Sequence, residues 1–487
     1  MKPDPDPQPG WTEQPAFGLD PSTPVVSDWW TLFNDPVLNS LVETALLRNN
    51  SLEIAGLNVL EARAQLGVAV GAQYPQSQFA QGSVTYISPS ENTGTTTNFW
   101  QYGIGANIAW EADFWGRFRR GIESADAAYL ASIAGYDQAL VLLTAQVVDT
   151  YILIRSFEEQ LRIAKENAAI QKRSYDIASV LFRNGQDSEL DMQQANTLLL
   201  STLATIPALE VSIKQAENAL SILLGQAPGS VQGLIGHGPI PALPEDLSIG
   251  LPADMLRRRP DVRQAEWLAM SQNALVGLAE ADLYPSFSLT GSIGLSAGSP
   301  GNSSFGELFS SDAMTFSIGP SFVWPFLNYG RIRNTIRVQD ARLQQALVNY
   351  RETVLQAARE TEDAMTAYVG ARQQADILKK TVVSAERSNE LSTLRYSEGF
   401  SDYQRVLDAQ QALFTQQQRL VTNTSETVRN VVSLFKALGA GWEGRAEYPF
   451  IDAETMEEMQ QRTDWGDLME YPAGDVTSDG QRRQVDW

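Results

Sequence analysis

The chain carries two copies of one sequence pattern, and this duplication restricts the fold more than any other feature. Tyr74-Pro75 recurs 210 residues later as Tyr284-Pro285, and Gly116-Arg117 recurs 214 residues later as Gly330-Arg331. Further pairs at the shift of 210 are Leu52/Val262, Ala55/Ala265, Ala64/Ala274 and Gly67/Gly277, and at the shift of 214 they are Phe182/Tyr396, Gly185/Gly399, Ala195/Ala409 and Gly225/Gly439. A shift that stays constant over such distances indicates two structural repeats of one plan.

Each repeat is expected to contain a helix, two strands, a long helix and a return helix. The first repeat spans residues 28–225 and the second 252–442, joined by a Gly- and Pro-rich linker at 226–251. An extended segment (1–27) precedes them and an acidic tail (443–487) follows. The expected elements are a helix at 36–72, strands near 77–88 and 99–113, and helices at 117–183 and 188–224, then a helix at 252–282, strands near 286–296 and 314–325, and helices at 331–397 and 402–438. Tyr-Pro ends each first helix, because proline cannot continue a helix.

The strand segments alternate between apolar and small polar residues, which is the pattern of a sheet with two different faces. The polar positions are mostly Ser, Thr, Gly, Asn and Gln, and aromatic residues mark the apolar positions: Trp100, Trp110, Phe316, Phe322 and Trp324. In a soluble sandwich the apolar face would be core, whereas in a membrane barrel it would meet lipid. The scarcity of charge on the polar face favours the barrel. Residues 77–87 alternate poorly, and their faces are not assigned.

Four strands cannot close a barrel, because single-chain membrane barrels begin at eight strands. If these strands lie in a membrane, several chains must therefore contribute. Three chains would supply twelve strands and leave room for a lumen.

The helices after the strands are unusually long. No proline lies between Pro89 and Pro207 or between Pro325 and Pro449, and a 67-residue helix at 117–183 would be ~100 Å long. In the second long helix, apolar or small residues recur in a coiled-coil heptad: Ile336, Leu343, Tyr350, Ala357, Ala364 and Ala371, with Leu347, Val354, Thr361 and Tyr368 in the second seam. Gly185 and Gly399 are expected to end the long helices in the left-handed conformation.

Composition excludes several kinds of chemistry. The chain has no cysteine and one histidine, so disulfides, thiol nucleophiles, cysteine metal sites and two-histidine mechanisms are excluded. His237, between two glycines of the linker, is expected to be a surface loop residue, and we expect no metal site and no cofactor. The formal net charge of −22 argues against nucleic acid as a partner. No run of 18 apolar residues occurs, so no transmembrane helix is expected.

At this point the chain resembles the outer-membrane factors of tripartite (RND-type) efflux systems, the TolC-like family, and most closely its NodT/OprM-like lipoprotein branch. The resemblance extends from Asp28 to Trp442. The matching stretches are Asp28-Trp29-Trp30-Thr31-Leu32-Phe33, Asp35-Pro36, Leu60-Glu61-Ala62-Arg63-Ala64, Trp110-Glu111-Ala112-Asp113-Phe114-Trp115-Gly116-Arg117, Leu251-Pro252, Arg258-Arg259-Pro260-Asp261-Val262, Tyr284-Pro285-Ser286-Phe287, Leu407-Asp408-Ala409-Gln410 and Ala437-Leu438-Gly439-Ala440-Gly441-Trp442.

The resemblance implies a mixed α and β fold, an internally duplicated channel-tunnel. In it, three chains build a trimeric 12-stranded outer-membrane β-barrel that continues into a long periplasmic α-helical coiled-coil barrel. The implied location is the bacterial outer membrane, spanning into the periplasm. The implied partners are two further copies of the chain, a periplasmic adaptor (membrane fusion) protein, an inner-membrane transporter and outer-membrane lipid. The implied function is a passive exit channel for efflux, without enzymatic activity.

The resemblance also implies where the channel is controlled. Gln404, Asp408 and Gln411 occupy the family's constriction positions and share one helical face. The family often has an apolar residue where Gln404 stands and an arginine where Gln411 stands, so its gate network is not copied in full. A ring of three Asp408 carboxylates could hold a cation weakly, although an ordinary solvated charge is the alternative. Arg405 and Asp191, at equivalent positions of the two repeats, are expected to pair across the tip.

Adaptor contacts are expected at the two tip turns, which contain Arg183, Asn184 and Gly185 in the first repeat and Glu398 and Gly399 in the second. Two departures from the branch concern the chain's ends. Mature members begin with a lipid-bearing cysteine, whereas this chain begins with Met1. The acidic residues after Trp442 favour a solvated tail; alternatively the tail wraps the periplasmic equator with Trp465 and Tyr471 as anchors.

Two alternatives remain at this stage. One is a type I protein-secretion conduit of the same fold. The other, from a different class, is a structural coiled-coil or adhesin-like protein whose strands form a soluble cap. The residues do not distinguish drugs, metals, solvents or peptides as cargo.

Overall fold

Two 67-residue helices, α3 (Arg117–Arg183) and α7 (Arg331–Ser397), dominate the computed structural model and have the bounds that the sequence predicts. Each begins after a glycine in the left-handed region, Gly116 at φ 78° and Gly330 at φ 84°. The structure describes residues 19–20, 27–90, 92, 97–243, 247–248, 257–301, 304–447 and 449–469.

The chain divides into two compact units, and each unit draws on both sequence repeats. The first comprises Val59–Ile133 and Gln264–Arg351, and it contains the four-stranded sheet. The second comprises the described residues of Asp4–Asn58, Ala134–Arg263 and Glu352–Trp487, and it contains the helical hairpin tips. Equivalent parts of the repeats therefore pack together, and neither repeat is a compact unit on its own.

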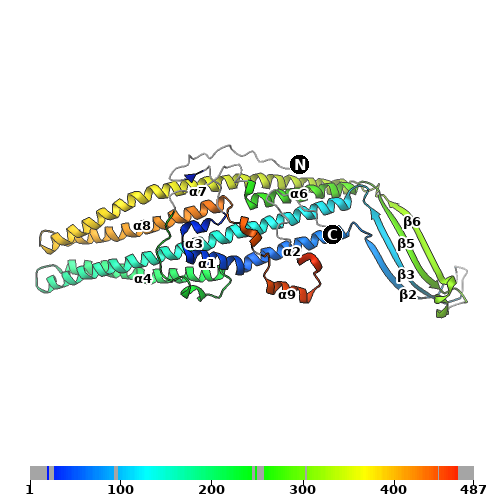
Figure 1. Cartoon of the computed structure of the whole chain (residues 1–487), viewed down its shortest axis with the longest axis horizontal. Helices are drawn as coiled ribbons and strands as arrows, with labels where there is room; N and C mark the ends of the chain where they lie inside the picture. The colour runs from blue at the N-terminus through cyan, green and yellow to red at the C-terminus, as the bar shows by residue number, and fades with distance from the viewer. Residues whose placement is uncertain are drawn as a thin grey trace. The chain divides into compact units, whose positions relative to one another are not determined.

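The sheet of the first unit is antiparallel throughout (Figure 1). Its strands are β2 (Ser77–Ile87), β3 (Phe99–Ala112), β5 (Ser286–Ala297) and β6 (Met314–Val323), in the order β2-β3-β5-β6. The two repeats thus meet at the central β3–β5 pair, and β2 and β6 are the edge strands.

Strand pairing assigns the two faces of the sheet. Across β3, β5 and β6, one row of paired residues contains Ile108, Gly291 and Ile318. The adjacent row contains Asn107, Ser292 and Ser317. Side chains alternate along a strand, so one face is apolar and the other carries small polar groups. The register also assigns β2, where Val84 and Tyr86 join the apolar face, opposite Tyr102 and Trp100.

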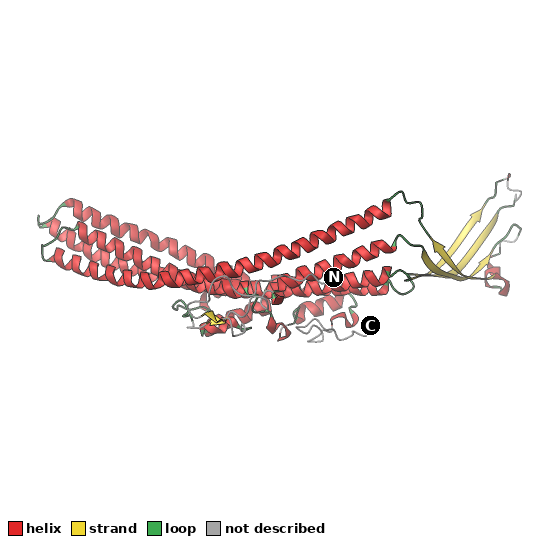
Figure 2. Cartoon of the chain, turned by 90° about the horizontal axis from the view of Figure 1, so that it is seen from above, coloured by secondary structure: helices red, strands yellow, loops and turns green. Residues whose placement is uncertain are grey.

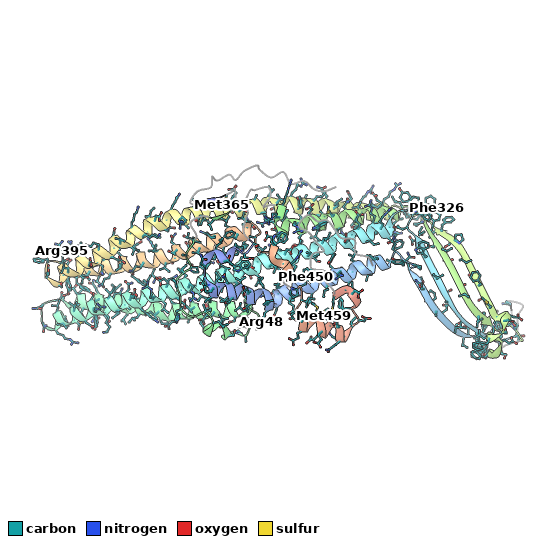
Figure 3. All side chains as sticks on the ribbon, in the orientation of Figure 1. Arg48, Phe326, Met365, Arg395, Phe450 and Met459 are labelled. Atoms are coloured by element: carbon teal, nitrogen blue, oxygen red, sulfur yellow. The ribbon has the colours of Figure 1, made fainter. Side chains whose placement is uncertain are left out.

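The apolar face is not covered within the chain. Ile104, Ile108, Ile293, Phe316 and Ile318 are 46 to 67% exposed. Side chains stand out on both sides of the strands, and among the described residues no second layer covers either face (Figure 3). The soluble-sandwich interpretation requires such a layer and is therefore not supported.

The central strand pair depends on two facing glycines. A Cβ at Gly294 would lie 2.7 Å from the carbonyl oxygen of Ile104, and a Cβ at Gly105 would lie 2.9 Å from that of Ile293. Because both obstacles are backbone atoms, only glycine fits at this crossing of β3 and β5.

The first helix of each repeat differs from the prediction. Residues 36–72 form two helices, α1 (Pro36–Arg48) and α2 (Asn50–Gly71), because Asn49 adopts an extended conformation and its side chain accepts from Leu52 N–H at 2.9 Å. In the second repeat the helix is α6 (Pro260–Ala281), shorter than the predicted 252–282; residues 251–256 lie outside the described part.

The return helices are α4 (Glu189–Leu223) and α8 (Gln404–Ala437), within two residues of their predicted bounds. Figure 2 shows long helices joined by loops at one end of the helical part. Gly185 and Gly399 have φ of 69° and 77°. In each turn the glycine N–H and the next N–H bond back to the end of the long helix, as in Gly185 to Phe182 and Gln186 to Leu181. This is the Schellman arrangement, which satisfies carbonyls that a helix end otherwise leaves free.

The heptad prediction for α7 is confirmed in its middle section. Tyr350, Ala357, Thr361, Ala364 and Tyr368 are at most 7% exposed. Small alanines at these positions let neighbouring helices approach closely.

The predicted linker and N-terminal segment contain some regular structure. Within 226–251 lie a short 3-10 helix (Ser230–Gly233) and strand β4 (Leu247–Ser248), which pairs in parallel with β1 (Leu19–Asp20). His237 is exposed as expected, and its Nδ1 lies 2.6 Å from Oε1 of Glu158.

The prediction of a solvated acidic tail holds for helix α9, which has no buried residue, but it is wrong where the segment packs on the rest of the second unit. Residues 443–469 contain 3-10 turns and helix α9 (Ala453–Arg462), and Ile451 is 1% exposed. Arg445 Nη1 donates to Asp137 Oδ1 of α3 at 2.8 Å, and Phe450 packs edge-on against Tyr136. Trp465 is half-buried, and Tyr471 lies outside the described residues.

Two helices are long and apolar enough to span a membrane by composition, contrary to the expectation of none. They are α3 and α4. The apolar window of α3 is 67% buried, as in the core helix of a soluble domain. The window of α4 is 11% buried, and its apolar side chains are exposed in the single chain.

Candidate functional site

A side-chain hydrogen bond joins the two hairpins of the second unit at their tips. The Tyr396 hydroxyl, near the end of α7, donates to Asp187 Oδ2 in the turn between α3 and α4. The same ring packs against Tyr403 at the start of α8, with centroids 5.0 Å apart. A residue of the second repeat therefore fixes the turn of the first.

The pKa values of the two carboxyl groups at this contact, Asp187 and Asp191, are shifted in opposite directions. Burial acts to raise the pKa of Asp187, but hydrogen bonds from Tyr396, Asp191 and the Ser188 N–H outweigh it and hold that pKa below its ordinary value. Burial and the neighbouring Asp187 raise the pKa of Asp191. Burial, together with the bond to Asp187, raises the pKa of Tyr396, so the phenol keeps the proton that it donates.

An apolar layer supports the tip contact. Ala178, Ala195, Tyr403, Val406 and Leu407 form a buried cluster from α3, α4 and α8, with the Tyr396 ring packed against it. Burial raises the pKa of Tyr403 to about 12.

Polar contacts between α3 and α8 follow along the same interface. Gln410 Nε2 donates to Ser174 Oγ at 2.6 Å, and Asn167 Nδ2 donates to Gln417 Oε1 at 2.7 Å. Farther from the tip, Arg429 of α8 makes two bonds to Asp149, at 2.6 and 3.0 Å. These contacts fix the alignment of α8 against α3.

The three predicted constriction residues lie on the exposed face of α8. Gln404 Nε2 donates to Asp408 Oδ1 at 2.9 Å, and Gln411 lies one turn further along, also exposed. The opposite face carries Val406, Leu407 and Gln410, which are buried. Gln404, Asp408 and Gln411 therefore point away from the buried face of α8.

The predicted pair of Arg405 with Asp191 is not present within the chain. Arg405 Nε lies 3.6 Å from Asp402 Oδ1, an exposed pair three residues apart. The Asp191 carboxylate instead accepts from Ser188 Oγ at 2.8 Å, and the Asp191 N–H donates to that oxygen. Arg405 and Asp191 thus each have a nearer partner, at the start of their own helix.

The tip turns predicted for adaptor contact are exposed. Arg183, Asn184, Gly185, Glu398 and Gly399 carry no buried side chain, and a Cβ at either glycine would meet nothing within 4 Å. The positive φ of the glycines is therefore a backbone requirement and not a packing requirement.

The predicted aromatic positions form two groups on the sheet of the first unit. The indole N–H groups of Trp110 and Trp324 donate to the carbonyls of Gln73 and Leu283, at 3.2 and 3.1 Å. Trp100 packs against Tyr86 towards the other end of the strands, with centroids 5.0 Å apart. Phe316 and Phe322, both 67% exposed, lie on the apolar face with them. Aromatic rings at both ends of an apolar band are typical of membrane interfaces.

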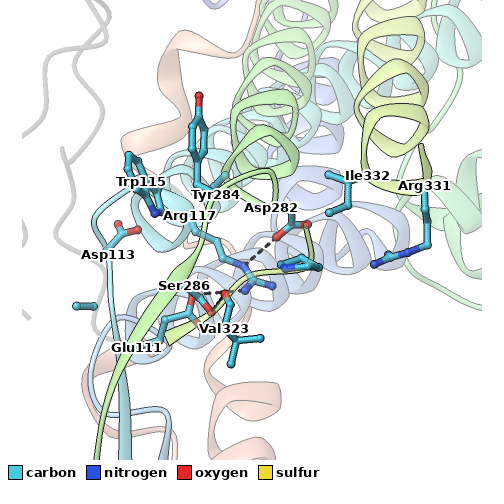
Figure 4. A pocket seen from close by; sticks show the side chains of 13 residues that line it. Glu111, Asp113, Trp115, Arg117, Asp282, Tyr284, Ser286, Val323, Arg331 and Ile332 are labelled. Carbon is cyan, nitrogen blue, oxygen red and sulfur yellow. Dashed lines mark hydrogen bonds and ion pairs between the residues drawn. The ribbon is translucent and has the colours of Figure 1, made fainter. Parts of the chain in front are cut away.

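A cavity of about 280 Å³ lies where the sheet of the first unit meets its helices (Figure 4). Arg117 crosses it, with nitrogen atoms 3.5 Å from Glu111 and 3.7 Å from Asp282. Trp115 stacks on Tyr284 at the cavity wall. Within the described residues no group of three potential metal ligands occurs.

Sequence reasoning missed the tip contact. Its signal lies in the duplication itself, because the repeats differ in polarity there. Phe182 of the first repeat corresponds to Tyr396, and Asp187 corresponds to Ser401. The Tyr396 hydroxyl has no counterpart at Phe182, and the Asp187 carboxylate has none at Ser401. Each group that forms the bond therefore occurs in one repeat only.

A four-stranded antiparallel sheet with an exposed apolar face, together with long helix pairs that end in glycine turns, defines the protomer of an outer-membrane channel. The chain belongs to the outer membrane efflux protein family, which it matches over residues 41–226 and 251–440. The two matched ranges correspond to the two repeats. The chain is therefore an outer-membrane efflux channel that extends into the periplasm.

Named relatives and solved structures agree. Nodulation protein T of Rhizobium leguminosarum bv. trifolii is 30% identical over 416 residues, covering 85% of this chain and 88% of the relative. The probable outer membrane lipoprotein SilC of Salmonella typhimurium is 32% identical over 417 residues, with the same coverage. The outer-membrane channel OprN superposes with a TM-score of 0.84 at 31% identity, covering 91% of this chain and 99% of that one. These similarities exclude the adhesin-like alternative.

Proposed function

We propose that three copies of the chain close one twelve-stranded barrel and one helical tunnel, and that the hairpin tips gate the periplasmic end. The observation that carries the gate is the Tyr396–Asp187 bond, which ties the two hairpins of a chain together. On this proposal an adaptor protein separates the hairpins on docking. The channel itself is passive, and an inner-membrane transporter supplies the energy.

Two features of the single chain support a trimer. The outer edges of β2 and β6 have no partner strand among the described residues. In addition, α4 exposes Leu200, Leu203 and Val211, and α7 exposes Val348 and Leu355, each at least 42% exposed. Apolar stripes and open strand edges of this kind favour burial against another copy.

Cargo selection is proposed to lie with the transporter. CusC of Escherichia coli, named as a cation efflux protein, is 30% identical to this chain, and SrpC of Pseudomonas putida, named for solvent efflux, is 31% identical. Similar identity to relatives named for such different substrates supports an exit channel that does not choose its cargo. A type I secretion conduit is the second candidate, and the genes beside this one distinguish it, because a protein-exporting transporter would replace the efflux transporter.

Single-channel conductance in planar bilayers tests the gate. Tyr396→Phe removes only the hydroxyl that reaches Asp187, and the closed channel should become leakier while the trimer still forms. Asp408→Ala, which removes the proposed carboxylate ring and its weak cation site, should also raise leak. A folded Tyr396→Phe trimer with unchanged closed conductance would show that this bond does not hold the gate.

A further inference from the structure

The two junctions between sheet and long helix have the same framework but a different charge balance. Both begin the helix after a left-handed glycine, and Arg117 and Arg119 of α3 correspond to Arg331 and Arg333 of α7. The acidic residues are not retained. Leu327 stands where the first repeat has Asp113, and Arg337 stands where it has Glu123.

At the first junction these acids neutralise the arginines. Arg120 Nη1 lies 2.5 Å from Glu123 Oε2, and Arg117 lies between Glu111 and Asp282. Asp113 accepts from the N–H groups of Phe118 and Arg119 at 3.2 and 3.0 Å. The α3 start is therefore balanced within its own unit.

At the second junction the positive charge has no such balance. Arg331, Arg333 and Arg337, which we call the basic turn, are exposed, while Ile332 between them is 4% exposed. Arg337 donates only to the neutral Asn334, and none of the three has a carboxylate partner among the described residues. In Figure 4 no interaction joins Arg331 to Asp282.

The loop that precedes the basic turn exposes large apolar side chains. In this β6–α7 loop (Trp324–Gly330), Phe326 and Leu327 are 69% exposed and Tyr329 is 97% exposed. Figure 3 shows Phe326 where the sheet ends. A loop of a water-facing surface would rarely present three such residues among seven.

The loop is held in this conformation by its own hydrogen bonds. Asn328 Nδ2 donates to the Pro325 carbonyl, its Oδ1 accepts from the Gly330 N–H, and the Trp324 indole is bonded to Leu283. Tyr329 has a φ of 48°, a conformation that costs free energy for a residue with a side chain. The exposure of the rings is thus built into the loop.

We propose that the β6–α7 loop and the basic turn form a membrane-anchoring surface that binds the phosphate groups of phospholipids in the periplasmic leaflet. Two observations support phospholipid as the ligand of this surface. The loop continues the apolar sheet face directly, since Phe322, which lies on that face at the end of β6, is 67% exposed. Three unbalanced guanidinium groups directly beyond the apolar band match a layer of phosphates.

The spacing fits the headgroup layer. Arg331 and Arg333 lie ~3 Å apart along the helix axis and Arg337 ~9 Å from the start, whereas the headgroup region is ~5–7 Å thick on each side of the hydrocarbon. The first two arginines reach phosphate directly, and the long side chain of Arg337 can extend back to it. The inference rests on the apolar sheet face meeting lipid, which the same experiment checks separately.

The absence of cysteine allows the full chain to be labelled at one site at a time. In liposome-reconstituted protein, a nitroxide at Tyr329→Cys should be more accessible to oxygen than to a water-soluble nickel complex. A nitroxide at Ile318→Cys reports on the sheet face alone, and one at Arg359→Cys on a water-facing part of α7. A lipid-exposed Ile318→Cys with a water-exposed Tyr329→Cys would overturn the anchor while leaving the barrel intact.

Lipid preference tests the arginines. Spin-labelled phosphatidylglycerol should associate with the wild-type trimer in preference to phosphatidylcholine, and each arginine near the surface contributes about fivefold. We expect the preference to fall at least tenfold in R331Q/R333Q/R337Q and to persist when the three residues are changed to lysine. The matched control removes the same charge farther along α7, in R342Q/R351Q/R359Q, and should change nothing.

Two other outcomes would reject the proposal. If R331Q/R333Q/R337Q dissociates the trimer but leaves the lipid preference unchanged, the basic turn contacts another protein chain. If inorganic phosphate abolishes the preference when chloride of equal ionic strength does not, the arginines bind a free anion and not the membrane.

Discussion

Asn49 and Arg259 occupy equivalent positions of the two repeats, and each donates a side-chain hydrogen bond to the last residue of a return helix. Asn49 Nδ2 reaches the Leu223 carbonyl at 2.9 Å, and Arg259 Nη1 reaches the Ala437 carbonyl. Leu223 and Ala437 are themselves equivalent, as the final residues of α4 and α8. The duplication has kept the contact and changed the donor.

Arg259→Ala should therefore destabilise the protein more than Asn49→Ala. Arg259 also bonds to Asp261 and Glu360, its residue is 5% exposed, and its positive charge lies at the negative end of α8. Loss of a charged hydrogen bond costs about 1.5–3 kcal/mol, compared with about 1 kcal/mol for a neutral one. Thermal unfolding of the trimer in detergent measures the difference. Arg258→Ala, which removes a 41% exposed guanidinium paired with Glu443, is the control and should have a small effect.

The Asp137–Arg445 pair should make the stability of the second unit depend on pH. Burial raises the pKa of Asp137 to about 6 even though Arg445 and Arg263 act to lower it. A carboxyl whose folded pKa is raised loses stability as pH rises, here between about 4 and about 6. In Arg445→Ala the ionised carboxylate has lost its nearest partner, so the loss should be about 3–5 kcal/mol at pH 8 and smaller at pH 5.

Melting temperatures of Arg445→Ala and the wild type at pH 5 and pH 8 measure this effect. Adding Asp137→Asn to the variant removes the buried charge, and it should restore most of the stability lost at pH 8. An equal loss at both pH values would contradict an electrostatic origin and would point to lost packing of residues 443–469.

Most of the fold follows from local sequence signals. The bounds of α3 could be predicted because Gly116 and Gly185 stand at its two ends and proline is absent between them. The break at Asn49 was harder to predict, because an apolar periodicity continues across it. The local cap on Leu52 N–H is accompanied by a hydrogen bond to Leu223, which lies 174 residues away. The membrane face of β2 also required the pairing partner, since its own alternation is weak.

At the tip and in the C-terminal segment, prediction from sequence is limited by contacts between residues that lie far apart in the chain. The sequence places Asp408 on one helical face with Gln404, and the structure retains that relation. The Tyr396–Asp187 bond joins two repeats across 209 positions, and no spacing rule predicts it. Acidic composition indicated a solvated tail after Trp442. Buried Ile451 and the ion pairs of Glu443 and Arg445 with Arg258 and Asp137 show instead that a few such contacts suffice to dock a charged segment.

The tip should become less firmly closed as pH rises. Burial raises the pKa of Asp191, and separating the hairpins would expose this carboxyl to water, so closure should weaken as pH rises through the pKa of Asp191. The lowered pKa of Asp187 has the opposite sign, and its contribution is lost only as pH falls through its own value. Closed-channel conductance should therefore rise as pH rises through the pKa of Asp191.

Asp191→Asn imitates the protonated carboxyl and should remove this rise, leaving the channel closed at neutral pH. Asp402→Asn changes an exposed carboxylate of the other tip and serves as the control, with the pH dependence of the wild type expected. A rise that persists in Asp191→Asn would assign the titration to another group.

Docking at the tips can be tested without disturbing the barrel. Gly399→Trp places a large ring on an exposed turn where a Cβ meets no neighbour within 4 Å, so the hairpin has room for it. The φ of 77° adds a backbone cost, and Gly399→Asn controls for that cost because asparagine tolerates the left-handed conformation. We expect Gly399→Trp trimers to reach the outer membrane in normal amounts but to fail in efflux, whereas Gly399→Asn retains function. Full efflux by the tryptophan variant, measured as drug or metal tolerance with the cognate adaptor and transporter, would show that docking does not occur tip to tip.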